Sequence, residues 1–315
     1  MDEFDFINNI KKKYSLGLVG DDCAVLARDG QTDLLVTSDM LIEGIDFRLD
    51  WTTPQMLGHK ALAVSLSDIA AMGGTPSWGL LSIGVPEALW STGFLDEFYE
   101  GWHELARLHD VELAGGDVSR ASSAFVIDST VGGFVVKGKA IKRSGASPGE
   151  AIYVSGTLGG AAAGLKQLNE GLRGSPDDLP SMMRRQLRPF PQIQLAKRLQ
   201  IYGLATSMID ISDGLSSDLA HICQASNTGA RVYADKLPFD ADLLEWAGSY
   251  EAALELAMHG GEDFELLFTA DPEKIFAAGL EGVTRIGEMT GNPGNIELIR
   301  NDEVRPLPPL GYRHF

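Results

Sequence analysis

The chain is 315 residues long and 44% hydrophobic, which is enough to form the core of one very large domain or of two ordinary ones. It carries 26 basic and 44 acidic residues, and this net charge of −18 argues against nucleic acid or an anionic membrane as a partner. Phosphate ligands are not excluded, because bound Mg²⁺ can reverse the local sign of a carboxylate site.

The cysteines and the N-terminus suggest a cellular setting. Cys23 and Cys223 are far apart and match neither zinc nor redox spacing, so we expect a reducing compartment. The first residues, Met1 to Asp5, lack the basic start and apolar run of a signal peptide. No apolar stretch approaches membrane-spanning length, and we therefore expect a soluble, cytoplasmic protein.

Strands and helices alternate in the first half of the chain. The helix expected after Pro54 is closed by Gly73-Gly74, and Trp102 belongs to an apolar stripe at helical spacing, which indicates core rather than a ligand platform. The expected strands are 34–37, 78–85, 111–114 and 125–136, and the expected helices are 54–72 and 95–106.

A run of small residues and turn formers, from Ser144 to Gly149, is the best domain boundary. We therefore divide the chain into residues 1–145 and 146–315. In the second part we expect strands at 151–154, 230–233, 264–269 and 283–286, and an exposed loop at 171–180. We also expect a glycine-rich turn followed by an alanine-rich helix from 156 to about 168, and helices at 191–201 and 215–225.

Two glycine-rich segments imitate nucleotide loops. Gly133 to Lys139 has P-loop spacing, but Ala140 replaces the Mg²⁺-binding Ser or Thr and 134–136 has the pattern of a strand, so we interpret the match as chance. Ser155 to Gly160 is placed like a dinucleotide loop, but no strand ending in an acid follows at the right distance. Helix packing or a modest phosphate contact is the better interpretation.

Acidic residues recur beside glycine or serine in six short packets. A single packet of this kind is usually a helix cap or a turn. Capping and turn formation account less well for six packets in one chain. Carboxylates on tight turns are hard oxygen ligands that suit Mg²⁺, which usually faces phosphate on its other side. The first hypothesis is a Mg²⁺-dependent enzyme acting on a nucleoside triphosphate. The packets are Gly20-Asp21-Asp22, Thr37-Ser38-Asp39, Leu66-Ser67-Asp68, Gly115-Gly116-Asp117, Asp210-Ile211-Ser212-Asp213-Gly214 and Gly260-Gly261-Glu262-Asp263.

Eight segments in this order resemble the thiamine-monophosphate kinase family, within the superfamily of aminoimidazole ribonucleotide synthetase. They are GDDCA (20–24), TSDMLIEG (37–44), KALAVSLSDIAAMG (60–73), GGD (115–117), RSGA (143–146), DISDGL (210–215), GGEDFEL (260–266) and GYRHF (311–315). The resemblance implies an α/β N-terminal domain that dimerises through its sheet and an α+β C-terminal domain. It also implies ATP bound between acidic loops, with thiamine monophosphate as the acceptor.

The resemblance further implies roles for single residues. Several Mg²⁺ ions would be bound by Asp22, Thr37, Ser38, Asp39, Asp68, Asp117, Asp210 and Asp213. ATP would contact Gly116, Asp117, Arg143 and Ser212, and the substrate would contact Asp46, Glu262 and Tyr312. The expected catalytic residues are Asp68, Asp117 and Asp213, and a monovalent cation is a further possible cofactor.

The phosphoryl transfer that the resemblance implies accounts for the large number of acidic packets. Two highly charged phosphates must approach each other, and phosphoryl transfer depends mainly on positioning and charge neutralisation. Metal ions on several aspartates would meet that need. An ionised phosphate oxygen is already a nucleophile, so we expect direct in-line transfer without a general base or a phosphoenzyme.

Two positions depart from the family pattern. Asp46 replaces a histidine, and Gln192 replaces the second arginine of Arg-Pro-x-Pro-Arg. Asp46 either pairs with the cationic ring of the substrate or makes no contact with it, and drift at tolerant positions is the simpler interpretation. The alternatives to the kinase are another ATP-using member of the superfamily and a nucleotide-binding module without catalysis.

Overall fold

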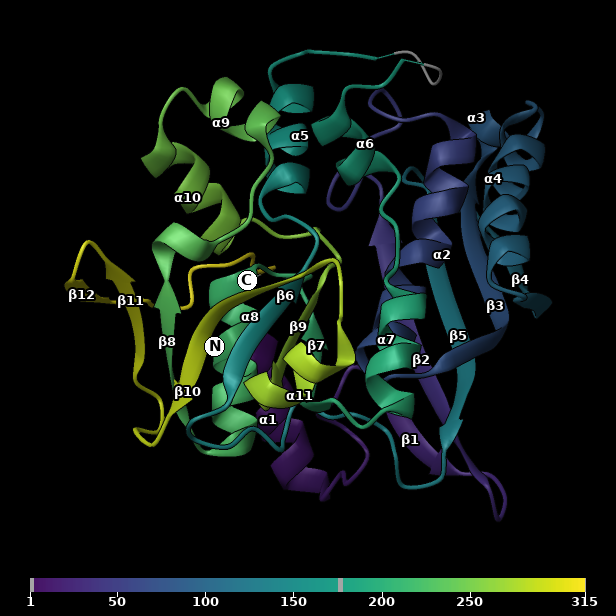
Figure 1. Cartoon of the computed structure of the whole chain (residues 1–315). Coiled ribbons are helices and arrows are strands. Elements are labelled where there is room, and N and C mark those ends of the chain that lie inside the picture. Colours follow the sequence, from purple (N-terminus) through teal and green to yellow (C-terminus); the bar gives the residue numbers. More distant parts are fainter. Residues whose placement is uncertain (1–2, 175–177, 315) are drawn as a thin grey trace.

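The computed structural model describes residues 3–174 and 178–314, which form two domains side by side (Figure 1). The first contains a five-stranded sheet in the order β1-β2-β5-β3-β4, and the second a seven-stranded sheet in the order β12-β11-β8-β10-β6-β9-β7. Both sheets are mixed, since β3–β4 and β8–β11 are parallel pairs among antiparallel neighbours. This architecture confirms the expected two-domain fold.

The N-terminal domain is a sheet with helices over one face. Its strands are β1 (Ala24–Ala27), β2 (Thr32–Ile42), β3 (Thr75–Pro86), β4 (Glu112–Ala121) and β5 (Val126–Val136). The helices of this domain are α2 (Pro54–Ala71), α3 (Glu87–Trp90) and α4 (Phe94–Leu108), and α1 (Glu3–Tyr14), at the start of the chain, is drawn apart from this sheet in Figure 1. α4 packs on α2 and buries Phe98, Trp102 and Leu105, which confirms the core interpretation of Trp102.

The C-terminal domain follows a linking segment, 137–150, which contains the proposed boundary at residue 145. Its strands are β6 (Ala151–Ser155), β7 (Ala205–Asp210), β8 (Gly229–Tyr233), β9 (Leu266–Ala270), β10 (Val283–Thr290), β11 (Ile296–Arg300) and β12 (Glu303–Pro306). Its α-helices are α5 (Gly160–Asn169), α6 (Ser181–Leu187), α7 (Ile193–Ile201), α8 (Leu215–Ser226), α9 (Ala241–Ala247), α10 (Tyr250–His259) and α11 (Pro272–Ala278), with a short 3-10 helix at Ala234–Lys236.

Helix α2 lies between the two domains and is buried on nearly all sides. Thr53 caps its N-terminus, because the Thr53 hydroxyl accepts the Met56 N–H, and Pro54 occupies the first turn. Fifteen of its 18 residues are buried. The helix contacts β2, β5 and α4 in the first domain and α6, α7 and β7 in the second. Most of its residues are apolar, and polar residues such as Lys60, Ser65 and Ser67 have hydrogen-bond partners inside the protein, so the helix can be buried on nearly all sides.

The strands of the first sheet are longer than the sequence indicates. β2 continues past Asp39 to Ile42, since it pairs with β5 over its whole length, and β4 runs through Gly115-Gly116-Asp117 beside β3. Pairing with a neighbour therefore extends these strands through residues that look like turn formers. Of the loop expected at 171–180, residues 175–177 lie outside the described part of the chain, and so does Phe315 of the last motif.

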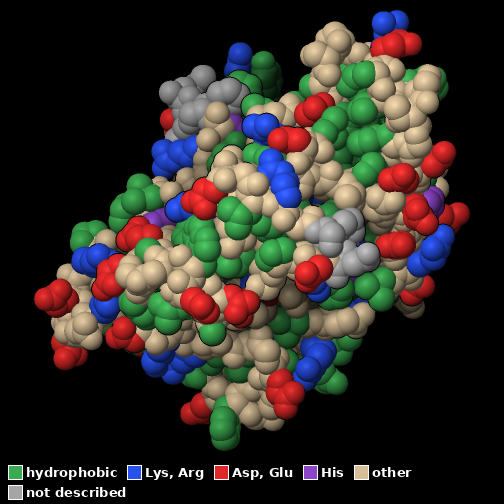
Figure 2. Space-filling model, turned by 90° about the horizontal axis from the view of Figure 1, so that it is seen from above, with side chains coloured by type: hydrophobic (Ala, Val, Ile, Leu, Met, Phe, Trp, Pro, Cys, Tyr) green, Lys and Arg blue, Asp and Glu red, His purple; other side chains and the backbone are tan. Residues whose placement is uncertain are grey.

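The surface agrees with the charge of the sequence. Figure 2 shows acidic side chains scattered over one face, with Lys, Arg and apolar side chains among them. Within residues 3–174 and 178–314, no helix is long and apolar enough to cross a bilayer.

Candidate active site

Three carboxylates from distant parts of the chain meet where the two domains face each other. Asp22 precedes β1, Asp68 lies in the last turn of α2, and Asp210 is the last residue of β7. One oxygen from each lies within 4.8 Å of the others. Their packets were singled out in the sequence, and the fold brings these three together.

Hydroxyl groups orient the acids of this cluster. Ser67 Oγ donates to Asp210 Oδ2 at 2.6 Å, and Thr37 Oγ1 donates to Asp68 Oδ2. Asp39 lies on β2 beside the cluster and accepts a 2.6 Å hydrogen bond from the hydroxyl of Ser65. Such bonds fix side-chain rotamers, which is how residues behind a metal ligand tune its geometry.

Burial and mutual repulsion raise the pKa values of these acids. Burial is the main cause that raises the pKa of Asp210 to about 7, and repulsion by Asp22 adds to it. Burial likewise raises the pKa of Asp39 to about 6 and that of Asp68 well above its usual range. A site whose carboxylates repel one another in this way suits a cation.

Arg143 supplies one positive charge to the cluster from the segment that links the domains. Its Nη2 lies 2.6 Å from Asp22 Oδ1, and its backbone N–H donates to Asp21 at 3.1 Å. The other oxygen of Asp22, Oδ2, is buried and has no hydrogen-bond partner in the described part of the chain. A buried carboxylate oxygen without a donor is the feature that a hard metal ion would satisfy.

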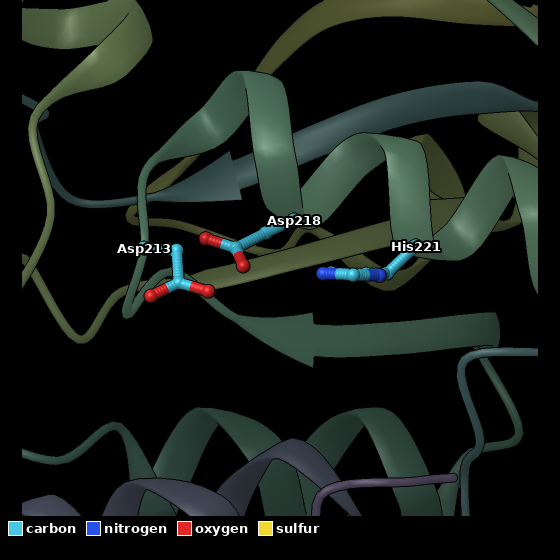
Figure 3. A group of neighbouring side chains, drawn as sticks. All are labelled: Asp213, Asp218 and His221. Carbon is cyan, nitrogen blue, oxygen red and sulfur yellow. The ribbon is translucent and has the colours of Figure 1, made fainter. Parts of the chain in front are cut away.

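A second group of possible ligands lies at the start of α8. Figure 3 shows the carboxylates of Asp213 and Asp218 close together, with the His221 ring on the same side of the helix. Asp218 Oδ2 also accepts the Gly214 N–H at 3.0 Å and so supports the turn that carries Asp213. Burial lowers the pKa of His221 to about 4, so the ring is neutral near pH 7. Asp213 was expected here; Asp218 and His221 were missed, although their i, i+3 spacing was a signal.

A cavity of about 290 Å³ adjoins these acids and is lined by both domains. It brings together six of the expected site residues: Asp39, Asp46, Ser212, Asp213, Glu262 and Tyr312. Its apolar wall includes Leu41, Val64 and Phe264. A partly apolar cleft with a few convergent polar groups is the usual form of a small-molecule site.

Asp46 is one of four acidic residues that line this cavity. Its Oδ2 accepts the Ile42 N–H at 2.8 Å, which closes a short loop after β2. In the part of the chain that the structure describes, no Lys or Arg forms an ion pair with Asp46. Its negative charge is therefore not neutralised by a protein cation.

Three expected residues lie away from this cluster. Side chains alternate along a strand, so the register that turns Asp39 toward α2 turns Ser38 and Asp117 to the opposite, exposed face of the sheet. Asp117 and Gly116 lie on the edge strand β4, three strand spacings or roughly 14 Å from β2. Within one protomer, Asp117 is therefore not part of the cluster formed by Asp22, Asp68 and Asp210.

Comparison with known proteins gives one family over the whole chain. Residues 20–136 match the AIR synthase related protein N-terminal domain, and residues 147–298 match the corresponding C-terminal domain. The thiamine-monophosphate kinase of Escherichia coli K12 is 40% identical, covering 99% of this chain and 95% of that protein. The thiamine-monophosphate kinase of Bacillus subtilis is 34% identical and covers 100% of both.

A solved structure is similar over the same length. AaThiL complexed with AMPPCP and TMP is 33% identical and has a TM-score of 0.89, covering 100% of this chain and 97% of that one. The similarity therefore extends over both domains and the cavity between them.

Proposed function

The chain belongs to the thiamine-monophosphate kinase family of AIR synthase related proteins, and we propose that it transfers a phosphoryl group from ATP to thiamine monophosphate at the cavity between its domains. One observation carries this proposal. A single cavity combines acids beside the carboxylate cluster, Asp39 and Asp213, with Asp46, Glu262 and Tyr312, which are suited to the rest of the acceptor.

We propose that the cluster holds Mg²⁺. The donors are carboxylate and hydroxyl oxygens, and Asp22 has a buried oxygen without a donor, which is the donor set that hard cations prefer. When bound, Mg²⁺ would neutralise charge on the phosphates that approach each other. The proposed ligands are Asp22, Thr37, Asp39, Asp68, Asp210 and Asp213. Ser38 and Asp117, which lie on the opposite face of the sheet, are not proposed as ligands of this cluster.

The protein groups position the two substrates. Arg143, fixed on Asp22, and Ser212, in the wall of the cavity, are the proposed ATP contacts. The acceptor phosphate is itself the nucleophile, so the reaction requires alignment more than a base, and transfer is in line. Asp46 would lie against the cationic ring and Tyr312 would supply an aromatic surface.

We further propose a homodimer formed through the open face and edge of the first sheet. Strand β4 has one unpaired edge, and exposed apolar side chains such as Met40, Leu80 and Val118 are present on β2, β3 and β4. Gly116 and Asp117 lie on this edge strand, so such a dimer would place them at the interface between the two chains. We propose a cytoplasmic setting for the enzyme, and a monovalent-cation requirement stays a prediction.

Product analysis tests the function. The protein is incubated with ATP, Mg²⁺ and either thiamine monophosphate or thiamine, and the products are separated by chromatography. We expect thiamine diphosphate from the monophosphate alone, and none from Asp68→Asn. Absence of product from the wild-type protein, with ATP still bound, would contradict the proposal and point to a nucleotide-binding module. A labelled phosphoprotein would contradict direct transfer.

A further inference from the structure

Helix α2 contains a buried lysine, and apolar packing alone does not explain a charged side chain at that position. Lys60 lies in the middle of the helix, only 3% exposed, and its neighbours in the helix from Met56 to Val64 are buried as well. Lysine is rarely buried unless it is paired, because removing an ammonium group from water is costly. The position of Lys60 therefore requires a specific partner.

That partner is Glu262, which lies in the cavity wall of the other domain. Lys60 Nζ is 2.8 Å from Glu262 Oε1, and it also donates to the backbone carbonyl of Gln186 at 3.2 Å. The side chain of Gln186, on α6, donates from Nε2 to Glu262 Oε2. Both carboxylate oxygens are thus held, one by the first domain and one by the second.

Gln186 makes this contact at a cost to its own hydrogen bonding. A carboxylate only accepts hydrogen bonds, so the amide nitrogen must face Glu262 and the amide oxygen must point away from it. That oxygen is buried and has no partner among the described residues. A buried acceptor without a donor is destabilising, so the orientation of Gln186 is explained by its contact with Glu262.

The backbone of Glu262 is held just as firmly. Its φ is +64°, which is uncommon for a residue other than glycine, and its N–H donates to the Ser212 carbonyl at 2.8 Å. At the preceding Gly261 a Cβ would lie 2.5 Å from that same carbonyl oxygen, so only glycine fits there. Strained backbone of this kind persists where the surroundings fix it, and it is concentrated at functional sites.

We propose that Lys60 and Gln186 are positioning residues that orient the Glu262 carboxylate toward the thiamine part of the acceptor. This inference rests on the proposed function, and it adds two residues to the recognition of that substrate. Because Lys60 neutralises Glu262, the pair recognises the acceptor by directed hydrogen bonding, whereas Asp46 is an acidic residue of the same cavity that forms no ion pair with a described Lys or Arg. A purely structural ion pair between the domains is the competing explanation, and buried pairs often add little stability.

The test is a double-mutant cycle of Lys60→Met and Glu262→Gln, with kcat, the KM for each substrate and the melting temperature measured for every variant. A charge-assisted hydrogen bond is worth about 1.5–3 kcal/mol, so Lys60→Met should raise the KM for thiamine monophosphate about tenfold or more. The KM for ATP should stay within about twofold of wild type. In the Glu262→Gln background, Lys60→Met should add almost nothing.

Two further variants keep the test decisive. Gln186→Leu removes only the second contact to Glu262 and should raise the same KM even if Lys60→Met fails to fold. Lys166→Met, at an exposed position on α5 beside the cavity wall, is the matched control and should have no effect. Unchanged KM values in folded Lys60→Met and Gln186→Leu, or fully additive effects in the cycle, would contradict the inference while the kinase activity stands. A wild-type protein that neither binds nor phosphorylates thiamine monophosphate would overturn the proposed function and this inference with it.

Discussion

The buried acid Asp210 gives a sharp prediction for stability in the absence of metal. It is 2% exposed, and its pKa is raised from 3.8 to about 7, mainly by burial. The unfolded chain releases this proton near pH 4, whereas the folded protein keeps it up to about pH 7. Between about pH 4 and about pH 7 the native state therefore binds more protons than the unfolded chain, and the free energy of unfolding falls as pH rises through this range.

The magnitude follows from the separation of the two pKa values. The two pKa values differ by about 3 pH units, and each unit corresponds to about 1.4 kcal/mol. Ionisation of Asp210 therefore lowers the free energy of unfolding by about 4 kcal/mol between about pH 4 and about pH 7. Asp210→Asn removes this titration, and the new amide oxygen can still accept the hydrogen bond from Ser67. We expect the variant to be more stable than wild type at about pH 8 in EDTA, by an amount of that order, and nearly equal to it near pH 4.

The assay is chemical or thermal unfolding from about pH 4 to about pH 8, in EDTA and in Mg²⁺. In EDTA the wild type should lose stability as pH rises, and Asp210→Asn should show a shallower slope, since Asp39 and Asp68 still titrate. With Mg²⁺ the wild-type slope should flatten or reverse, because a bound metal displaces the protons. Asp96→Asn, at an exposed position on α4, is the matched control. A wild type whose stability in EDTA does not fall over this range would refute the reasoning.

Three other substitutions test the site and its support. Asp68→Asn should abolish formation of thiamine diphosphate but not lower the melting temperature in EDTA, since a neutral amide takes the place of a carboxyl whose pKa burial raises well above its usual range; a lower melting temperature would mean that Asp68 is structural. Arg143→Met should raise the KM for ATP and destabilise the fold by about 3–5 kcal/mol in urea titrations, because it leaves Asp22 buried without its cation. Gly116→Ala should lower the urea midpoint, because a Cβ there would lie 1.9 Å from a carbonyl oxygen of β3, whereas Gly30→Ala meets nothing within 4 Å and should have little effect.

The sequence predicts the acidic part of the site because its signal is local. Each packet sets an acid beside a small residue, and three of them supply the Asp22, Asp68 and Asp210 carboxylates that meet in space. The weak P-loop match at Gly133 to Lys139 begins in a strand and not in a loop, because Gly133 lies inside β5 and pairs with Leu35. The family resemblance then links the packets to one fold, which the comparisons confirm.

The parts that could not be predicted depend on register and on contacts between domains. Whether Asp117 points toward α2 is decided by its pairing with Ser82, and a shift of one residue would reverse the face. Lys60 stands in a run of apolar residues, where its charge is visible but its partner, 202 residues away at Glu262, is not. Such long-range pairings leave no periodic signal in a single sequence.

The position of α2 explains why the site needs both domains. Ser65 and Ser67 are two residues apart, which turns their side chains about 200° from each other around the helix. Ser65 therefore reaches Asp39 in the first sheet, and Ser67 reaches Asp210 in the second. Only a helix enclosed by both domains can orient acids on both sides, and this accounts for its nearly complete burial. Neither domain alone contains Asp22, Asp68 and Asp210, so the docking of the domains on α2 is what assembles the cluster.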